Sequence, residues 1–169
     1  MEANQRREKI LEDLHESILP ISASALARTY SVSRQIIVGD IALLRAGGSR
    51  IVSTPRGYLL EKERAGIVRQ VACRHTAGQM RDEMYAIVDQ GCIIENVIVE
   101  HPIYGEITGN LDVASRLEVD RFIEKCEKSS AAPLSILTEG IHLHTLTCPD
   151  EDAYRSACDS LKELGFLLT

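Results

Sequence analysis

Apolar residues in the first 60 positions recur at helical spacing, and each run ends at a recognisable cap or breaker. The first apolar stripe consists of Ile10, Leu11, Leu14 and Ile18. It predicts a helix over residues 6–16, with Pro20 just beyond its end. Ser22 or Ser24 can begin a short second helix through residues 25–27. Ser33 can cap a third helix that runs to about Ala46, before two glycines. Residues 49–60 then form two short apolar runs about a Pro-Arg-Gly turn, so the order predicts a winged helix-turn-helix.

The third helix has two unlike faces. At about 100° per residue, its inward face is Ile36, Ile37, Ile41, Leu43 and Leu44. Its outward face is Arg34, Gln35, Val38, Gly39, Ala42 and Arg45. Arginine pairs with guanine and glutamine with adenine, while small side chains allow a helix to enter the major groove. The candidate DNA-binding residues, including two from the hairpin, are therefore Ser33, Arg34, Gln35, Val38, Arg45, Arg50 and Arg56. The alternative is a protein-binding module with incidental arginines.

From Gly66 onward the pattern changes to strands alternating with helices. Apolar runs predict strands over residues 67–73, 93–100, 105–112, 134–137, 141–146 and 166–169. Helical patterns cover residues 76–90, 114–128 and 150–164. We therefore expect two domains, a winged helix over residues 1–62 and an α+β regulatory domain with helices on a mixed sheet over residues 66–169.

Charge separates the same two regions. The chain has a net charge of −6, yet residues 1–64 hold ten Lys/Arg against eight Asp/Glu. Residues 65–169 hold nine against seventeen, and residues 22–60 hold five arginines against Asp40 alone. Screening limits the reach of remote charges to about 10 Å, so a locally basic module can meet DNA although the average is acidic.

Composition excludes several classes of protein. The 169 residues are 44% hydrophobic and 26% charged, which is typical of globular proteins. Glu95 and Glu100 interrupt the longest apolar runs, so no membrane span is expected. The charged N-terminal residues do not resemble a secretory signal, so a cytoplasmic protein is expected. Five scattered cysteines indicate reduced, mostly buried thiols rather than a disulfide framework.

Histidines of the second region have spacing that suits a metal ion. His142 and His144 alternate along a strand and therefore share one face, two rises of about 3.3 Å apart. His75 ends the first strand, immediately before a capping-box match at Thr76, and Glu83 falls on the inward edge of the following helix. An inward carboxylate is costly unless it is paired or binds a metal. Three imidazoles and one carboxylate suit a divalent transition ion, whereas a His-x-His pair alone is usually structural.

These motifs resemble the nicotinate-responsive transcription repressors of the NiaR type over essentially the whole chain. In the first region the resemblance rests on Ser33-Arg34-Gln35 and on residues 40–46. In the second it rests on His75 with Glu83, residues 101–105, residues 115–116, and residues 137–144, whose sequence is Leu-Thr-Glu-Gly-Ile-His-Leu-His. The sequence departs from the family at position 39, where Gly39 stands in place of an expected larger polar residue.

The resemblance implies a homodimeric repressor that binds operator DNA, with nicotinate as corepressor in the control of NAD precursor uptake and synthesis. It implies one divalent ion (Zn, Ni, Fe or Mn) held by His75, Glu83, His142 and His144. We hypothesise that His101, Tyr104 and Arg116 contact the nicotinate. Two other functions remain open: a regulator for which the metal itself is the signal, and a metal-dependent hydrolase with Glu139 as base. The winged helix favours a regulator over an enzyme.

Overall fold

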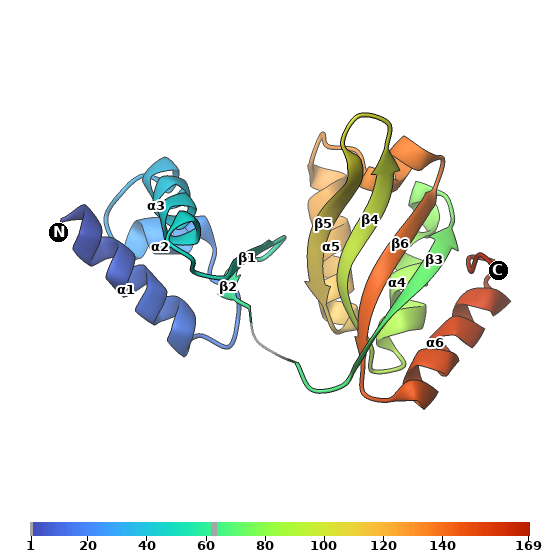
Figure 1. Cartoon of the computed structure of the whole chain (residues 1–169). Helices are drawn as coiled ribbons and strands as arrows, with labels where there is room; N and C mark the ends of the chain where they lie inside the picture. The colour runs from blue at the N-terminus through green and yellow to red at the C-terminus, as the bar shows by residue number, and fades with distance from the viewer. Residues whose placement is uncertain (1, 62–63) are drawn as a thin grey trace. The chain divides into compact units, whose positions relative to one another are not determined.

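The computed structural model describes residues 2–61 and 64–169 (Figure 1). The chain divides into two compact units, Met1–Glu63 and Arg64–Thr169. Each unit has a hydrophobic core of its own, built from side chains of that unit alone. Two separate cores are what independently folding domains require.

The N-terminal unit has the predicted order of three helices and a hairpin. These elements are α1 (Ala3–Glu16), α2 (Ala23–Thr29), α3 (Arg34–Ala46), β1 (Ile51–Thr54) and β2 (Gly57–Leu60). The Ser22 hydroxyl accepts a hydrogen bond from the Ala25 N–H at 3.1 Å, and the Ser33 hydroxyl accepts one from the Ile36 N–H at 3.3 Å. Both caps satisfy backbone donors that a helix start leaves free, and they set the first residues of α2 and α3.

The buried stripe of α3 is narrower than its sequence predicts. Ile37, Asp40 and Ile41 are buried, whereas Ile36 and Leu43 are 43% and 57% exposed. The small unit covers only one side of the helix, and a paired acid occupies part of that side. Ile18 was also expected inside, but α1 ends at Glu16 and Ile18 is 90% exposed.

The C-terminal unit is α+β, as predicted. In chain order it contains β3 (Ile67–Arg74), a 3₁₀ turn η1 (Ala77–Gln79), α4 (Met80–Val88), β4 (Ile93–His101), β5 (Gly105–Val113), α5 (Arg116–Lys128), a 3₁₀ turn η2 (Leu134–Thr138), β6 (Ile141–Cys148) and α6 (Glu151–Glu163). The sheet order is β3-β6-β4-β5. Figure 1 shows α4, α5 and α6 on one side of this sheet.

Three details of this unit differ from the sequence prediction. The three strand pairs described are all antiparallel, whereas the sequence predicted a mixed sheet. The strands β3 and β4, which α4 connects, run in the same direction, but β6 lies between them and runs opposite to both. Residues 134–138 form η2 instead of a strand, since Glu139 and Gly140 both take positive φ angles and β6 cannot begin before them. Residues 166–169 add only one bridge, between Cys73 and Leu167, beside β3.

The core of the C-terminal unit lies between the sheet and its helices. Alternate residues of β6 face this layer, among them Leu146 and Cys148, which pack with α4, α5 and α6. All five cysteines are free thiols, and three of them are buried, as predicted. Within the described ranges, no helix is long and apolar enough to cross a bilayer.

Candidate metal centre

Four side chains from three elements meet beside one end of the sheet. His142 and His144 lie on the helix-covered face of β6, because side chains alternate along a strand. The register places His142 opposite Cys73 and His144 opposite Val71 of β3. His75 follows β3 directly, and the Gln79 side chain accepts a hydrogen bond from the Thr76 N–H at 2.9 Å, which sets the start of the turn into α4. Glu83 lies in the first turn of α4, with its side chain towards the sheet.

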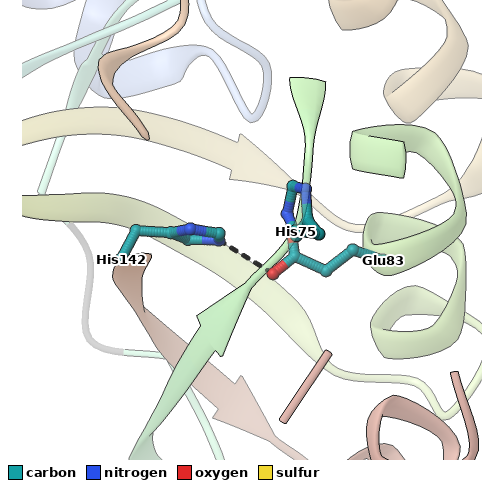
Figure 2. Close-up of side chains that lie close together, drawn as sticks. All are labelled: His75, Glu83 and His142. Carbon is teal, nitrogen blue, oxygen red and sulfur yellow. Dashed lines mark hydrogen bonds and ion pairs between the residues drawn. The ribbon is translucent and has the colours of Figure 1, made fainter. Parts of the chain in front are cut away.

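The three imidazoles converge on the Glu83 carboxylate, and Figure 2 shows two of them, His75 and His142, beside it. His75 Nε2 is 2.7 Å from Glu83 Oε2, and His142 Nε2 is 2.9 Å from Oε1. His144 Nε2 is 3.3 Å from Oε2. All four residues are buried, and Glu83 is only 1% exposed. Ligand atoms of His75, Glu83 and His142 all lie within 4.8 Å of one another, which is close enough to share one ion.

Each imidazole is oriented by a backbone carbonyl on its far side. The Nδ1 atoms of His75, His142 and His144 lie 2.7, 2.8 and 2.7 Å from carbonyl oxygens. A carbonyl oxygen only accepts hydrogen bonds, so each Nδ1 carries a proton. When a ring is neutral, the lone pair of its Nε2 then points towards Glu83, which is the usual arrangement of metal-ligating histidines. When the ring is protonated, its Nε2–H instead donates a hydrogen bond to the carboxylate.

The electrostatics of the cluster favour a positive charge at its centre. Burial alone would raise the pKa of Glu83, but the charge of His144 and hydrogen bonds from the three imidazoles hold that pKa well below its usual value. Burial would lower the pKa values of His75 and His144, yet the Glu83 carboxylate raises both. Three nitrogen lone pairs and a carboxylate repel one another unless a proton or a metal lies between them. The donor set therefore fits a divalent transition ion.

A pocket of about 490 Å³ adjoins the cluster on the side of His75. Its wall combines the end of β3, the turn η1 and the turn η2, and consists of Arg74, His75, Thr76, Ala77, Gln79, Ser135, Ile136, Glu139 and Gly140. The volume lies within the roughly 300–1,000 Å³ that is usual for small-ligand sites. Sequence reasoning missed Arg74, Ser135, Ile136 and Gly140 as site residues. The positions of Arg74, immediately before His75, and of Gly140, two residues before His142, signalled their proximity to the cluster.

The three residues expected to hold an effector lie in different places. His101 is the last residue of β4, at the end of the sheet where β6 begins. Its Nδ1 accepts hydrogen bonds from the N–H groups of Ile103 and Tyr104 at 3.2 and 3.3 Å. Neither His101 nor Tyr104 lines the pocket described above. Arg116 begins α5 and pairs with Asp89, which follows the far end of α4. The structure therefore does not bring Arg116 to the histidine cluster.

The expected DNA-contacting residues divide into exposed and structurally engaged groups. Arg34 and Gln35 are exposed on α3, Val38 is half-buried and Ser33 caps the helix. Arg45 donates hydrogen bonds to the Ile51 carbonyl at 2.8 Å and to the Ser53 hydroxyl at 2.6 Å, so it links α3 to the hairpin. In the hairpin region Arg50 is 3.8 Å from Glu61, and the Arg56 N–H donates to the Thr54 hydroxyl at 3.2 Å.

Comparison with known proteins gives matches in both units. An HTH domain matches residues 6–59, and a 3H domain matches residues 68–169. The chain is 44% identical over 164 residues to the probable transcription repressor NiaR of Thermotoga maritima, a match that spans 97% of this chain and 94% of that protein. It is 42% identical over 167 residues to the transcription repressor NadR of Bacillus subtilis, spanning 96% of this chain and 93% of that protein.

Proposed function

This chain belongs to the family of transcription repressors that join an HTH domain to a 3H domain, and we propose that it represses transcription in response to nicotinate. The N-terminal unit binds operator DNA, and the C-terminal unit binds one divalent transition ion together with the effector. The observation that carries this proposal is the convergence of three Nε2 atoms on Glu83 beside a pocket of ligand size. Such a repressor acts on the chromosome, in the cytoplasm.

The metal ligands in this proposal are His75, Glu83, His142 and His144. Imidazole nitrogen and carboxylate oxygen together suit Zn, Ni, Fe or Mn, and the chemistry of the donors does not separate these ions. A bound ion would supply a fixed positive charge that attracts a small carboxylate. The chain's own contribution is the orientation of the three rings through their Nδ1 hydrogen bonds.

Nicotinate occupies the pocket beside His75 in this proposal. The composition of residues 65–169 is strongly acidic and would repel a carboxylate, so binding requires a local cation. Arg74 lines the pocket and takes the place that the sequence suggested for Arg116. Glu139, on the same wall, opposes a carboxylate, which favours placing the carboxylate of nicotinate near Arg74 and the metal. His101 and Tyr104 remain candidates for the rim.

DNA binding is assigned to the exposed face of α3 and to the hairpin. Arg34, Gln35 and Val38 would face base edges in the major groove, while Arg45 positions the hairpin whose arginines, Arg50 and Arg56, reach the DNA backbone. A homodimer would present two such helices to a palindromic operator. The relatives' designation as repressors supports a regulator rather than an enzyme.

The proposal is tested by fluorescence anisotropy of metal-loaded protein on operator DNA, with nicotinate or nicotinamide added. We expect nicotinate to raise operator affinity at least tenfold, which corresponds to about 1.4 kcal/mol of coupling. Nicotinamide, which lacks the carboxylate, serves as the matched ligand control. Unchanged affinity on addition of nicotinate would exclude it as corepressor.

Variants and metal titration separate the remaining alternatives. His142→Ala and His144→Ala are expected to lose the metal and the heat of nicotinate binding, whereas His15→Ala, at an exposed position of α1, keeps both. If added metal raises operator affinity while the nicotinate concentration is held constant, the ion is itself the signal. If metal-free protein binds the operator as well as loaded protein does, a metal-sensing function is excluded.

A further inference from the structure

Gly140 lies between η2 and β6, at the point where the metal centre and the pocket meet. The β3–β6 register pairs Arg74 with Ile141, so one step outward it places Gly140 opposite His75. The backbone of Gly140 has a φ of +90° and follows Glu139, whose φ is +52°. A side chain is strongly disfavoured at such angles, which makes glycine the natural residue there.

Space around Gly140 excludes even a methyl group. A Cβ built on Gly140 would lie 2.3 Å from the His75 carbonyl oxygen, 3.3 Å from its carbon and 3.5 Å from the His75 nitrogen. All three neighbours are backbone atoms, so no side-chain rotation relieves the overlap. The lack of a side chain therefore allows the start of β6 to approach the backbone of His75.

The backbone of Gly140 also holds a second imidazole. Its carbonyl oxygen accepts the Nδ1–H of His142 at 2.8 Å, while its own N–H donates to the Ser135 carbonyl at 2.8 Å. One glycine thus contacts the backbone of His75, the ring of His142 and the turn η2. It also lines the pocket next to these residues.

We propose that Gly140 is a positioning residue of the metal centre, which sets the distance between His75 and His142 and the orientation of the His142 ring. This proposal rests on the metal binding proposed above. Metal–ligand distances tolerate changes of only about 0.2 Å, so a displaced β6 start moves Nε2 of His142 out of range. Loss of an orienting hydrogen bond to a ligating histidine typically lowers metal affinity 10–100-fold.

The test uses Gly140→Ala with two matched glycine controls in the full chain. Gly66 has a φ of +125° and a Cβ position 2.3 Å from the Cys148 carbonyl oxygen, at the opposite end of the same strand pair. Gly66→Ala therefore reproduces the strain and the overlap away from the histidines. Gly105, with a φ of +71° and open space around its Cβ position, reproduces the strain alone.

Two readouts are measured on each variant. The first is Co²⁺ affinity, followed through the visible absorption of the bound ion and checked by competition with Zn²⁺. The second is the Nδ1–H resonance of His142 in metal-free protein, with that of His144, which donates to the Asn96 carbonyl, as internal reference. We expect Gly140→Ala to bind Co²⁺ at least tenfold more weakly and to shift or lose the His142 signal only. Gly66→Ala and Gly105→Ala should keep the Co²⁺ affinity within twofold of the starting protein and leave the His142 resonance unshifted.

The outcomes divide clearly. Wild-type affinity in a folded Gly140→Ala variant overturns the positioning role, and so does an equal loss in Gly66→Ala. Failure of Gly140→Ala to fold while Gly66→Ala folds also overturns it, because Gly140 would then serve folding rather than ligand geometry. If the unchanged protein binds no Co²⁺, the proposed metal binding is refuted. The His142 resonance then still decides whether Gly140 orients that ring.

Discussion

The two units each bury one carboxylate, and the partners of the two acids differ. Asp40 of α3 is 3% exposed and meets the Arg6 guanidinium at 2.7 and 3.3 Å and that of Arg7 at 3.4 Å. Glu83 of α4 is 1% exposed and meets three imidazoles. Arginine is always protonated, so both partners of Asp40 carry a positive charge and offer no lone pair. Imidazole nitrogens offer lone pairs, so Glu83 requires a proton or a metal, and the partners of the acid rather than its burial distinguish a ligand site from a structural pair.

The largest expected effect separates the two acids by metal affinity. Glu83→Gln removes the only carboxylate ligand of the proposed centre, and we expect metal affinity to fall more than the 10–100-fold seen for residues that merely orient ligands. Asp40→Asn, a chemically identical change in the other unit, should leave metal affinity unchanged. Chelator competition and elemental analysis of both variants measure the difference. Equal retention of metal in both variants would remove the distinction drawn above.

Asp40→Asn should instead destabilise the N-terminal unit. The change leaves two arginines beside a neutral amide at a buried position, and breaking a buried pair from one side is destabilising. We expect the melting temperature of this unit to fall by at least about 4–8 °C, the shift that 1 kcal/mol causes in a domain of this size. Calorimetry should show the transition of the C-terminal unit unmoved. A stable Asp40→Asn protein would mean that the pair with Arg6 and Arg7 contributes little.

The same contrast between engaged and available side chains applies to the arginines of α3. Arg34 is exposed and faces the proposed groove, so Arg34→Ala should weaken operator binding about tenfold, in line with the roughly 1–3 kcal/mol of a base-contacting arginine. It should also reduce the preference for operator over random DNA. Arg45 contacts Ile51 and Ser53, so Arg45→Ala should loosen the hairpin. The affinities for operator DNA and for random DNA should then fall by the same factor. Anisotropy titrations at several salt concentrations distinguish the two, and the reverse pattern would exchange their roles.

The fold was predictable where local chemistry decides it. Serine caps and the helical spacing of apolar residues were sufficient for α2 and α3. Gly91 and Gly165, after α4 and α6, take the positive φ angles that are typical of glycines behind a helix end. The run Leu-Ser-Ile-Leu of η2 suits a strand and a turn equally, so its assignment depended on the angles of Glu139 and Gly140, which the sequence does not reveal. Strand order is also a tertiary property: nothing local indicates that β6 lies between β3 and β4.

The candidate site was predictable in part for the same reason. Period-two spacing put His142 and His144 on one face, and the helical angle turned Glu83 inward. Their meeting with His75 required β6 to pair with β3, which no local pattern indicates and which only the family resemblance implied. The pocket depends on η2 approaching the end of β3, which brings Ser135 and Arg74 together across 60 residues of chain. The family motif at residues 115–116 and the attraction of a guanidinium for a carboxylate suggested Arg116, which pairs with Asp89 after the far end of α4.

Arg116 provides the smallest of the expected effects. Its guanidinium donates hydrogen bonds to both oxygens of Asp89 at 2.7 and 2.5 Å and lies over the Tyr85 ring. These hydrogen bonds hold the pKa of Asp89 below its usual value. The stabilisation is therefore fully present above the ordinary aspartate pKa of about 3.9 and is lost as the pH falls through the lowered value.

Arg116→Ala should consequently reduce stability only slightly at neutral pH, because the pair is exposed and screened by solvent. The difference from the unchanged protein should shrink as the pH falls through the lowered pKa of Asp89 and vanish below it, where Asp89 is protonated in both the folded and unfolded chains. Denaturant unfolding at neutral and acidic pH measures this loss, and calorimetry of nicotinate binding should give the same affinity for both proteins. Arg74→Ala is the matched change in the pocket wall and should weaken the binding of nicotinate. A nicotinate affinity that depends on Arg116 but not on Arg74 would move the effector to the other end of α4 and separate it from the histidine cluster.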